Sequence, residues 1–427
     1  MVAALRIPKR HRHRTAPGGP AKSPKLVLVS MGSEPNEAIR VVMNGVTGRM
    51  GYNQHLVRSV LAINADGGVP LAGGSASSGD RAVRLEPVLV GRSDAKLRAI
   101  AERHGIMDWT TSLDEALDSL KDGGGIYFDA QVTSQRYDAV MKALGAGAHV
   151  YVEKPSGATS AEATELANAA DQAGVKHGVV QDKLFLPGIR ALKSLIDGGF
   201  FGRILSVRGE FGYWVFEGGW RAPQRPSWNY RKEDGGGIVL DMFPHWTYVL
   251  EGLFGSIEAV TARAVTHIPE RWDERGDRYD ATADDAAYAI FELAGGVVAQ
   301  LNSSWCVRVH RGELLEFQVD GTEGSAVAGL RDCVAQHRGV SPRPVWNPDI
   351  PNVSRFLDQW QPAPVDGEPG NAFRLQWEMF VRYVAENAPF PHDLHAGARG
   401  VHVAELGTLS SAEGRRIEVP ATGVSAR

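Results

Sequence analysis

Hydrophobic residues in the first half of the chain occur in short runs that alternate with helical patterns. The runs AIRVVMN, RLEPVLV and GGIYFDAQV are rich in β-branched and aromatic residues, which is typical of buried strands. Between the runs, AKLRAIAERHGI, RYDAVMKALGAG and SAEATELANAADQAG space their apolar residues three or four apart, as an amphipathic helix does. This alternation predicts a parallel sheet wound with helices.

After about residue 183 the alternation gives way to strands in succession. Strand patterns fill 204–216, 258–268, 284–293, 296–307 and 314–330, and helical patterns are confined to 186–199, 241–254 and 371–388. Successive strands favour a mostly antiparallel sheet with helices on one face. The sequence therefore predicts an α/β protein in three parts, with a basic flexible tail, a Rossmann domain and an α/β domain built on a large, mostly antiparallel open sheet. Their expected bounds are 1–37, 38–183 and 184–420.

The composition is that of a globular protein. Of 427 residues, 43% are hydrophobic and 22% are charged, which is close to the average for soluble domains. No apolar run approaches the eighteen or more residues that a membrane helix needs. The two cysteines, Cys306 and Cys333, are too few for a disulfide framework. We therefore expect a cytoplasmic protein that neither spans nor binds a membrane.

Charge is distributed unevenly along the chain. The sequence has 46 Lys and Arg against 50 Asp and Glu, a net charge of −4, and seven of the basic residues precede residue 26. The remainder carries 39 basic against 50 acidic residues, a formal charge of −11. A body of that sign is a poor nucleic-acid binder. The basic segment has little apolar surface to offset the entropy of ordering, so we interpret it as a solvated tail.

A glycine-rich turn follows the first predicted strand. Gly45, Gly48 and Gly51 are spaced G-x-x-G-x-x-G, ahead of a predicted helix. Such glycines let backbone N–H groups approach a pyrophosphate at the start of a helix. An ordinary strand-to-helix turn is the alternative. We predict a dinucleotide site here, made by these glycines with the intervening residues Thr47, Arg49 and Met50.

The second strand of the sheet bears on which nicotinamide nucleotide is bound. NAD enzymes commonly place an acid at the end of this strand to bind the ribose hydroxyls. This chain instead has Gly91, followed by Arg92 and Ser93. A guanidinium and a hydroxyl suit a 2′-phosphate, so NADP is favoured over NAD. A solvated Arg at a strand end is the alternative.

Two further segments carry residue types suited to proton and hydride chemistry. Glu153 and Lys154 end a strand whose carboxyl edge is expected to face the nucleotide, so both are predicted to bind the cofactor, and a Lys there can also stabilise an alkoxide. Asp241 and His245 are four apart, on one face of a predicted helix that Pro244 either kinks or opens. His is suited to moving a proton near neutral pH, and Asp241 can orient it or bind a substrate hydroxyl. A surface ion pair and a buried structural His are the alternatives.

These segments together resemble the Gfo/Idh/MocA oxidoreductases, the family of glucose-fructose oxidoreductase and inositol dehydrogenase. The resemblance is carried by YVEKPSG, GGFFGRILSVRGEF, GGGIVLDMFPH, DGTEGS and RLQWEMFVRYVAENAPFP, and it runs from about residue 40 to about residue 420. It implies hydride transfer between a nicotinamide and a sugar-like carbinol. By that resemblance Lys154, Asp241 and His245 are the catalytic residues.

The chain also departs from the family pattern. Its glycine spacing is one residue longer than usual, and Tyr248 stands where many members have Asp. The function predicted is an NAD(P)-dependent oxidoreductase of a sugar, polyol or sugar derivative. A sugar–sugar oxidoreductase with a tightly held cofactor, and a non-catalytic sensor of the same fold, are the alternatives.

Three further expectations complete the prediction. No metal site is expected, because the scattered His residues lack ligand spacing. The aromatic residues from Phe211 to Tyr230 form either a sugar-stacking wall or the packing of a sheet edge. The family resemblance implies a homodimer or homotetramer formed through the open sheet.

Overall fold

The computed structural model describes residues 38–72, 81–121, 124–213, 225–343, 347–351, 354–365 and 370–421. The expected basic tail at 1–37 lies outside the described residues, as do Trp214, Phe216 and Trp220 of the expected aromatic wall. In the part of the chain that is described, no helix combines the length and the apolar character needed to cross a membrane.

The first sheet has the strand order β2-β3-β1-β5-β6-β7, with β4 paired to β3. All of its pairs are parallel except β2 with β3. Because β1 lies between β3 and β5, the strand order reverses at β1, with β3 on one side and β5 on the other. The carboxyl end of β1 is therefore the switch point where such sheets bind ligands. The strands are β1 (Ala38–Asn44), β2 (Val69–Pro70), β3 (Ala82–Val90), β4 (Trp109–Thr110), β5 (Ile126–Asp129), β6 (His149–Val152) and β7 (His177–Val179).

Helices connect these strands, as the sequence predicts. Ser93 and Ser112 cap α2 and α3 by accepting hydrogen bonds from the backbone N–H groups of Lys96 and Glu115, and this stabilises helix starts. The helical segments of this half are η1 (Gly51–Leu61, a π-helix), α1 (Ala62–Ala65), α2 (Asp94–His104), α3 (Leu113–Asp118), η2 (Thr133–Gln135, a 3-10 helix), α4 (Arg136–Gly145) and α5 (Ser160–Ala173). The predicted Rossmann architecture is confirmed.

The second sheet has nine strands in the order β17-β16-β15-β14-β8-β13-β12-β9-β18. Its pairs are antiparallel except β13 with β8, so the predicted mostly antiparallel sheet is confirmed. The strands are β8 (Ile204–Gly212), β9 (Ile257–Val265), β12 (Ala286–Leu293), β13 (Val297–Ser304), β14 (Leu315–Gly321), β15 (Gly324–Ala328), β16 (Cys333–His337), β17 (Gln361–Pro362) and β18 (Ile417–Glu418).

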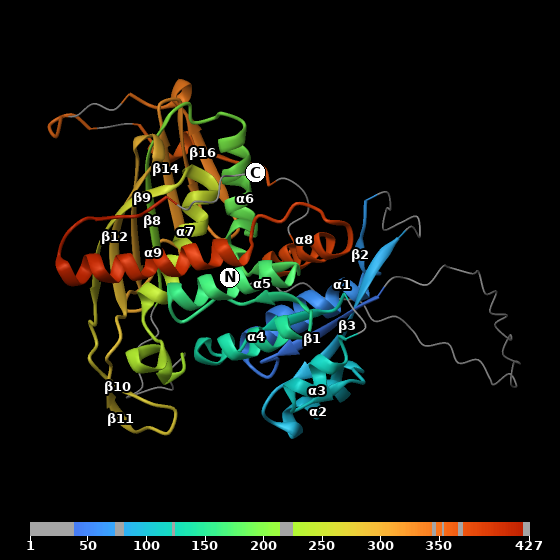
Figure 1. Cartoon of the computed structure of the whole chain (residues 1–427). Coiled ribbons are helices and arrows are strands. Elements are labelled where there is room, and N and C mark those ends of the chain that lie inside the picture. The colour runs from blue at the N-terminus through green and yellow to red at the C-terminus, as the bar shows by residue number, and fades with distance from the viewer. Residues whose placement is uncertain are drawn as a thin grey trace, which may run out of the picture. The chain divides into compact units, whose positions relative to one another are not determined.

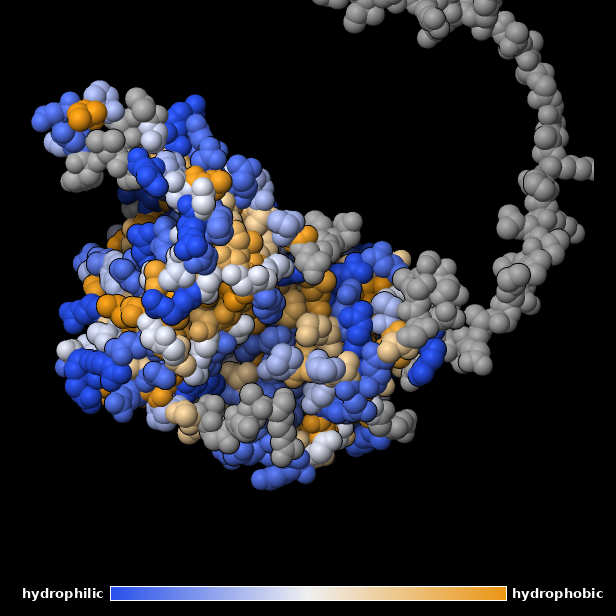
Figure 2. Space-filling model, turned by 90° about the horizontal axis from the view of Figure 1, so that it is seen from above, coloured by the Kyte–Doolittle hydropathy of each residue, from blue (hydrophilic) through white to orange (hydrophobic). Residues whose placement is uncertain are grey.

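Helices α6 (Pro187–Asp197), α7 (Ile238–Phe254) and α9 (Leu394–Glu413) lie on one side of this sheet (Figure 1). Their apolar residues share one core with the inward-facing side chains of the strands. The opposite face leaves several large apolar side chains exposed, among them Tyr288 and Ile290 of β12 and Val298 of β13. On the face seen in Figure 2, hydrophobic residues occur in small groups between hydrophilic ones.

The last two helices join the two sheets. α8 (Ala372–Glu386) lies in sequence between β17 and β18 of the second sheet, yet its Trp377, Phe380 and Val381 belong to the core of the first sheet. α9 packs against both α5 and α7. The sequence analysis missed α9 because its pattern is rich in glycine and alanine. Those small residues have a packing role, since a Cβ atom at Gly407 would lie 2.4 Å from the Phe243 ring.

Candidate active site

A cavity of about 370 Å³ opens at the carboxyl ends of β1, β3 and β5. Of the residues predicted to hold a nucleotide, Gly45, Thr47, Gly48 and Arg92 line it, together with Gly91. The cavity therefore lies where the fold places a ligand. Arg49, Met50 and Gly51 are not among its lining residues and begin the following helical segment.

The glycine turn is shaped for close backbone approach. Gly45 has φ +83°, and a Cβ atom there would lie 2.7 Å from the backbone carbon of Ala130. A Cβ atom at Gly51 would lie 2.6 Å from the Gly45 carbonyl oxygen. Because side chains cannot be accommodated at these positions, the turn stays open to a pyrophosphate. This cradle fits a dinucleotide cofactor.

Lys154 and Asp241 form a tight pair although they lie on different elements. Lys154 follows β6 and Asp241 lies in the first turn of α7, and the Lys154 Nζ atom donates to Asp241 Oδ1 at 2.5 Å and to the Asp241 carbonyl oxygen at 3.0 Å. Arg225 donates to the other carboxylate oxygen, Oδ2, at 3.0 Å. Burial alone would raise the pKa of Asp241, but the charges of Lys154 and Arg225 hold it well below its usual value. Asp241 is therefore ionised and fixes the Lys154 ammonium.

His245 lies one helical turn beyond Asp241 and is 5% exposed. Its Nδ1 atom is 2.6 Å from the Tyr248 hydroxyl, which in turn donates to Asp182 Oδ1 at 3.3 Å. Burial lowers the pKa of His245 well below 6.5, and the nearby charges of Lys154, Lys183 and Arg225 lower it further. The imidazole is therefore neutral at pH 7 and can accept a proton.

The Lys154 turn is tied to the nucleotide cavity by a buried arginine. Arg136 donates to the Pro155 carbonyl oxygen, and through Nη2 to the Gln131 carbonyl oxygen at 2.9 Å. Gln131 lines the cavity. Arg136 also pairs with Asp129 at 2.9 Å, and both side chains are buried. This network holds the Lys154–Pro155 turn beside the cavity wall.

The sequence of the chain also matches models of known protein families. Residues 72–181 match the model of an oxidoreductase family with an NAD-binding Rossmann fold, and residues 189–327 match a Gfo/Idh/MocA C-terminal domain. The chain is 56% identical over 387 residues to a D-xylose dehydrogenase of Paenarthrobacter nicotinovorans, covering 90% of this chain and 97% of that protein. The chain belongs to the Gfo/Idh/MocA oxidoreductase family.

More distant relatives and solved structures agree with this membership. An NADP⁺-dependent scyllo-inositol 2-dehydrogenase of Bacillus subtilis is 23% identical, covering 66% of this chain and 75% of that protein. A levoglucosan dehydrogenase solved with NADH and levoglucosan has a TM-score of 0.71 at 22% identity, covering 90% of this chain and 100% of its own. An aldose–aldose oxidoreductase from Caulobacter crescentus has a TM-score of 0.67 at 19% identity over the same shares. The chain is an NAD(P)-dependent oxidoreductase, and these two structures share its fold.

Within this Gfo/Idh/MocA enzyme, Glu153 has its carboxylate turned into the protein. Glu153 Oε1 is 2.8 Å from His55 Nε2, and Oε2 accepts from the Lys154 backbone N–H at 3.0 Å. Burial would raise the pKa of Glu153, but the hydrogen bond with His55 lowers it, with smaller contributions from the charges of Lys154 and Arg136. Both carboxylate oxygens are thus hydrogen-bonded within the protein.

Ser93, Gly236 and Gly237 also have contacts within the protein. Ser93 Oγ caps α2, as described above. Gly237 has φ +122°, and a Cβ atom there would lie 2.8 Å from Asp284 Oδ1. At Gly236 a Cβ atom would lie 2.4 Å from the Asn229 carbonyl oxygen. These glycines are required by the packing of the chain on itself.

Several residues that contact the predicted trio were not predicted from the sequence. Asp182 and Lys183 follow β7 and lie at the same carboxyl edge as Lys154, so the rule that found Lys154 could have found them. Arg225 gave no such signal, because it lies in an irregular loop. Of the expected aromatic wall, Tyr230 is buried and Tyr213 accepts a hydrogen bond from Arg225 Nε at 3.0 Å. These two aromatic residues therefore pack inside the second domain.

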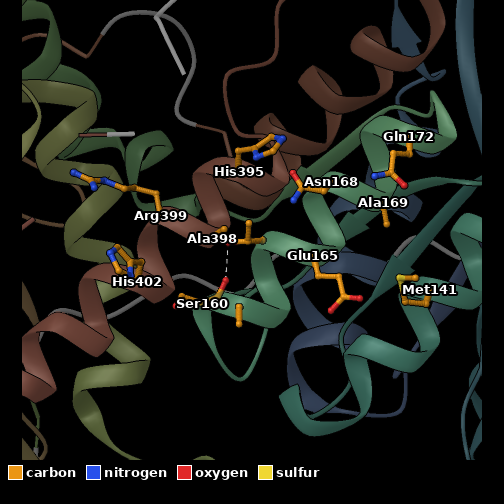
Figure 3. Close-up of a pocket in the computed structure, with 12 residues that line it drawn as sticks. Met141, Ser160, Glu165, Asn168, Ala169, Gln172, His395, Ala398, Arg399 and His402 are labelled. Atoms are coloured by element: carbon orange, nitrogen blue, oxygen red, sulfur yellow. Dashed lines mark hydrogen bonds between the residues drawn. The ribbon is translucent and has the colours of Figure 1, made fainter. Parts of the chain in front are cut away.

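A larger groove lies away from this site, between α4, α5 and α9 (Figure 3). It measures about 850 Å³ and is lined by residues that include Glu165, His395 and His402. None of the predicted site residues lines it. At the start of α5 in this groove, the Ser160 backbone N–H already has a hydrogen-bond partner, since it donates to Glu405 Oε1 at 2.7 Å. Among the described residues no group of three or more His, Cys, Asp or Glu side chains could hold a metal ion.

Proposed function

We propose that the protein is an aldose dehydrogenase that oxidises D-xylose or a sugar of similar shape, with Lys154, Asp241 and His245 as its catalytic residues. The observation that carries the proposal is the Lys154–Asp241 pair next to a neutral, buried His245, at the carboxyl edge of the sheet that forms the nucleotide cavity. The identity to a D-xylose dehydrogenase along nearly its whole length supports the substrate class.

Each residue has one role in the proposed reaction. The Lys154 ammonium, held by Asp241, donates a hydrogen bond to the substrate oxygen as negative charge develops on it. His245 accepts the hydroxyl proton at Nε2, the ring nitrogen that is not bonded to Tyr248. A bound nicotinamide supplies the acceptor for the hydride that leaves the carbinol carbon. The glycine turn at Gly45 and Gly48 is proposed to hold the pyrophosphate.

A screen of sugars and polyols tests this function. The purified protein is mixed with D-xylose, other pentoses and hexoses, and inositols, with NADP⁺ or NAD⁺ in excess, and reduced nucleotide is followed by absorbance. D-xylose or a close relative is expected to give the highest kcat/KM. Failure of all sugars with added nucleotide would contradict the proposal. Nucleotide that stays bound through gel filtration, with turnover only between two sugars, would instead identify a sugar–sugar oxidoreductase.

We also propose that NADP is the preferred nucleotide. Arg92 is exposed, lines the cavity and is followed by the capping hydroxyl of Ser93. An acidic side chain at position 91 would be in tight steric contact with Thr47, since a Cβ atom there would lie 3.2 Å from Thr47 Cγ2. A charge-assisted hydrogen bond from Arg92 to a 2′-phosphate contributes about 1.5–3 kcal/mol, which is roughly tenfold or more in preference.

The variant Arg92→Ala is expected to lower the NADP-to-NAD ratio of kcat/KM by roughly tenfold. Arg98→Ala is the matched control, because Arg98 carries the same charge on α2 but pairs with Asp94 and does not line the cavity. An unchanged ratio in Arg92→Ala would show that this residue is a solvated strand-end Arg.

The exposed face of the nine-stranded sheet is the proposed oligomer interface of a cytoplasmic homodimer or homotetramer. Leu205, Tyr288, Ile290 and Val298 are each 39–45% exposed and lie on β8, β12 and β13, which are adjacent. Apolar side chains on an open sheet face are typical of protein interfaces. Ile290→Glu combined with Val298→Glu is expected to give monomers in light scattering, whereas a wild-type monomer would contradict the proposal.

A further inference from the structure

The Tyr248 hydroxyl has three neighbours, each at hydrogen-bond distance. It is 2.6 Å from His245 Nδ1 and 3.3 Å from Asp182 Oδ1, and it accepts from the Lys183 backbone N–H at 3.1 Å. All four residues are on two elements, α7 and η3 (Asp182–Phe185). A phenol has one proton to donate, so only one of these neighbours can receive it.

The charges around Tyr248 decide where that proton lies. The Lys183 backbone N–H can only donate. The Asp182 carboxylate, which pairs with the Lys183 ammonium at 2.6 Å, accepts, and a hydrogen bond to a carboxylate is stronger than one to a neutral ring nitrogen. If Tyr248 donated to His245 instead, its oxygen would turn a lone pair toward the Asp182 oxygen. The Tyr248 proton therefore points to Asp182.

This direction fixes the tautomer of His245. With the Tyr248 proton on the Asp182 side, the phenol oxygen accepts from His245 Nδ1–H, so the remaining ring nitrogen, Nε2, carries a lone pair. No hydrogen bond to Nε2 is found within the described ranges of the chain. His245 Nδ1 is also only 3.9 Å from Asp182 Oδ1, close enough for the carboxylate to stabilise an imidazolium once Nε2 is protonated.

We propose that Tyr248 and Asp182 are positioning residues that hold His245 with its proton on Nδ1 and its Nε2 lone pair free for the substrate hydroxyl. The inference rests on the proposed function in that it takes His245 as the base. In the oxidation step the hydroxyl proton moves to Nε2 and the C–H hydride to the nicotinamide, leaving a C=O group. The added positive charge on the imidazole is balanced through Tyr248 by Asp182.

The tautomer can be measured without substrate. Protein labelled with ¹⁵N-histidine is examined by long-range ¹H–¹⁵N NMR at pH 7, and the His245 signals are assigned as those lost in His245→Asn. The wild type is expected to show a protonated Nδ1 and an unprotonated Nε2. In Tyr248→Phe, which keeps the ring and loses the hydroxyl, the tautomer protonated at Nε2 is expected to predominate. A wild-type His245 protonated at Nε2 would overturn the proposal.

Kinetics give the second readout. Tyr248→Phe is expected to lower kcat on the best substrate by on the order of 10²-fold, because the base spends most of its time in the wrong tautomer. KM and nucleotide affinity are expected to change little. Asp182→Asn, which keeps an acceptor but removes the charge, is expected to lower kcat by a smaller factor. Wild-type kcat in Tyr248→Phe would overturn the proposal.

Tyr151→Phe is the matched control. Tyr151 is fully buried, and its hydroxyl has no hydrogen-bond partner among the described residues. It is expected to keep the wild-type kcat and the wild-type His245 tautomer. An equal kcat loss in both variants would show that removing any buried phenol hydroxyl disturbs the enzyme, and would overturn the proposal. A wild type inactive on every sugar would contradict the proposed function, while the NMR result would still decide the tautomer.

Discussion

Two buried histidines of this enzyme lie beside carboxylates and yet differ in what they can do. His55 is bonded at both ring nitrogens. The Trp377 indole N–H, which can only donate, points to Nδ1 at 3.0 Å, so Nε2 must carry the proton that Glu153 accepts at 2.8 Å. His245 has a partner at Nδ1 and none at Nε2 in the described part of the chain. A histidine with both nitrogens engaged holds the structure, whereas one with a free nitrogen can move a proton.

The surroundings of the two rings extend this difference. His55 is fully buried and packs against aromatic rings, with Phe128 at 4.3 Å and Phe373 at 5.1 Å between centroids. His245 is surrounded by the cations Lys154, Lys183 and Arg225, which oppose its protonation. The first site joins α8 to the Rossmann sheet. The second site gathers residues from β6, η3 and α7 around one base.

The largest expected effect is on turnover and concerns the site around His245. Lys154→Ala removes the ammonium that stabilises the developing alkoxide and is expected to lower kcat by on the order of 10²-fold or more. Nucleotide affinity, measured by fluorescence titration, is expected to stay nearly unchanged. Wild-type turnover in this variant would remove Lys154 from the catalytic assignment.

The next largest expected effect is on the stability of the protein and concerns the site around His55. His55→Ala leaves the Glu153 carboxylate and the Trp377 N–H without their buried partner, which is expected to lower the free energy of unfolding by about 3 kcal/mol. Urea denaturation measures this loss. A loss below about 1 kcal/mol would mean that water or a rearranged side chain replaces His55 and that the ring is not structural.

Trp377→Phe sharpens the same comparison with a smaller change. It removes the N–H donor to His55 Nδ1 together with part of the buried ring, so the loss attributable to the hydrogen bond, about 1 kcal/mol, is the excess over a Trp→Phe change that breaks no hydrogen bond. Trp305→Phe is the control, because the buried Trp305 N–H has no partner among the described residues. Denaturation midpoints of the two variants are compared, and an equal loss in both would contradict a specific role for the Trp377 hydrogen bond.

The smallest effect concerns pH. Because burial, Lys154, Lys183 and Arg225 lower the pKa of His245 well below 6.5, the ring stays neutral throughout the neutral range. The rate needs the neutral form, so kcat/KM is expected to fall only as the pH drops below 6.5. A pH profile whose acid limb has its midpoint at or above 6.5 would show that His245 is not the base or is not surrounded as described.

The Rossmann sheet and its glycine turn could be predicted well from the sequence, because both depend on local signals, whereas the catalytic roles of Lys154, Asp241 and His245 stay a prediction. Strand and helix periods are local, and positions after parallel strands share one edge by geometry. The second sheet was predicted to be mostly antiparallel, but its strand β16 was not predicted. Helix α9 was also missed, because the glycines that pack closely on α7 resemble loop residues in a sequence. The bond from Trp377 to His55 joins residues 322 positions apart and leaves no local pattern.

Residue roles also depended on tertiary contacts. Glu153 was predicted to bind the cofactor, yet both of its carboxylate oxygens bond within the protein. Asp241 was expected to orient the imidazole or bind a substrate hydroxyl, and its carboxylate bonds Lys154 and Arg225. Tyr248, which the sequence marks only as a departure from the family, contacts His245. The residues of the site could be chosen from the sequence, but the side chains to which they are hydrogen-bonded could not.

The most direct test of the account is a side-by-side rate measurement on His245→Ala, His55→Ala and the wild type. Each folded protein is given the best sugar of the screen and excess NADP⁺, and initial rates of reduced nucleotide formation are compared per mole of folded enzyme. The account predicts that His245→Ala loses on the order of 10²-fold or more in kcat at nearly wild-type stability. It predicts the reverse for His55→Ala, which loses stability and far less turnover. A His245→Ala enzyme that turns over at the wild-type rate would contradict it.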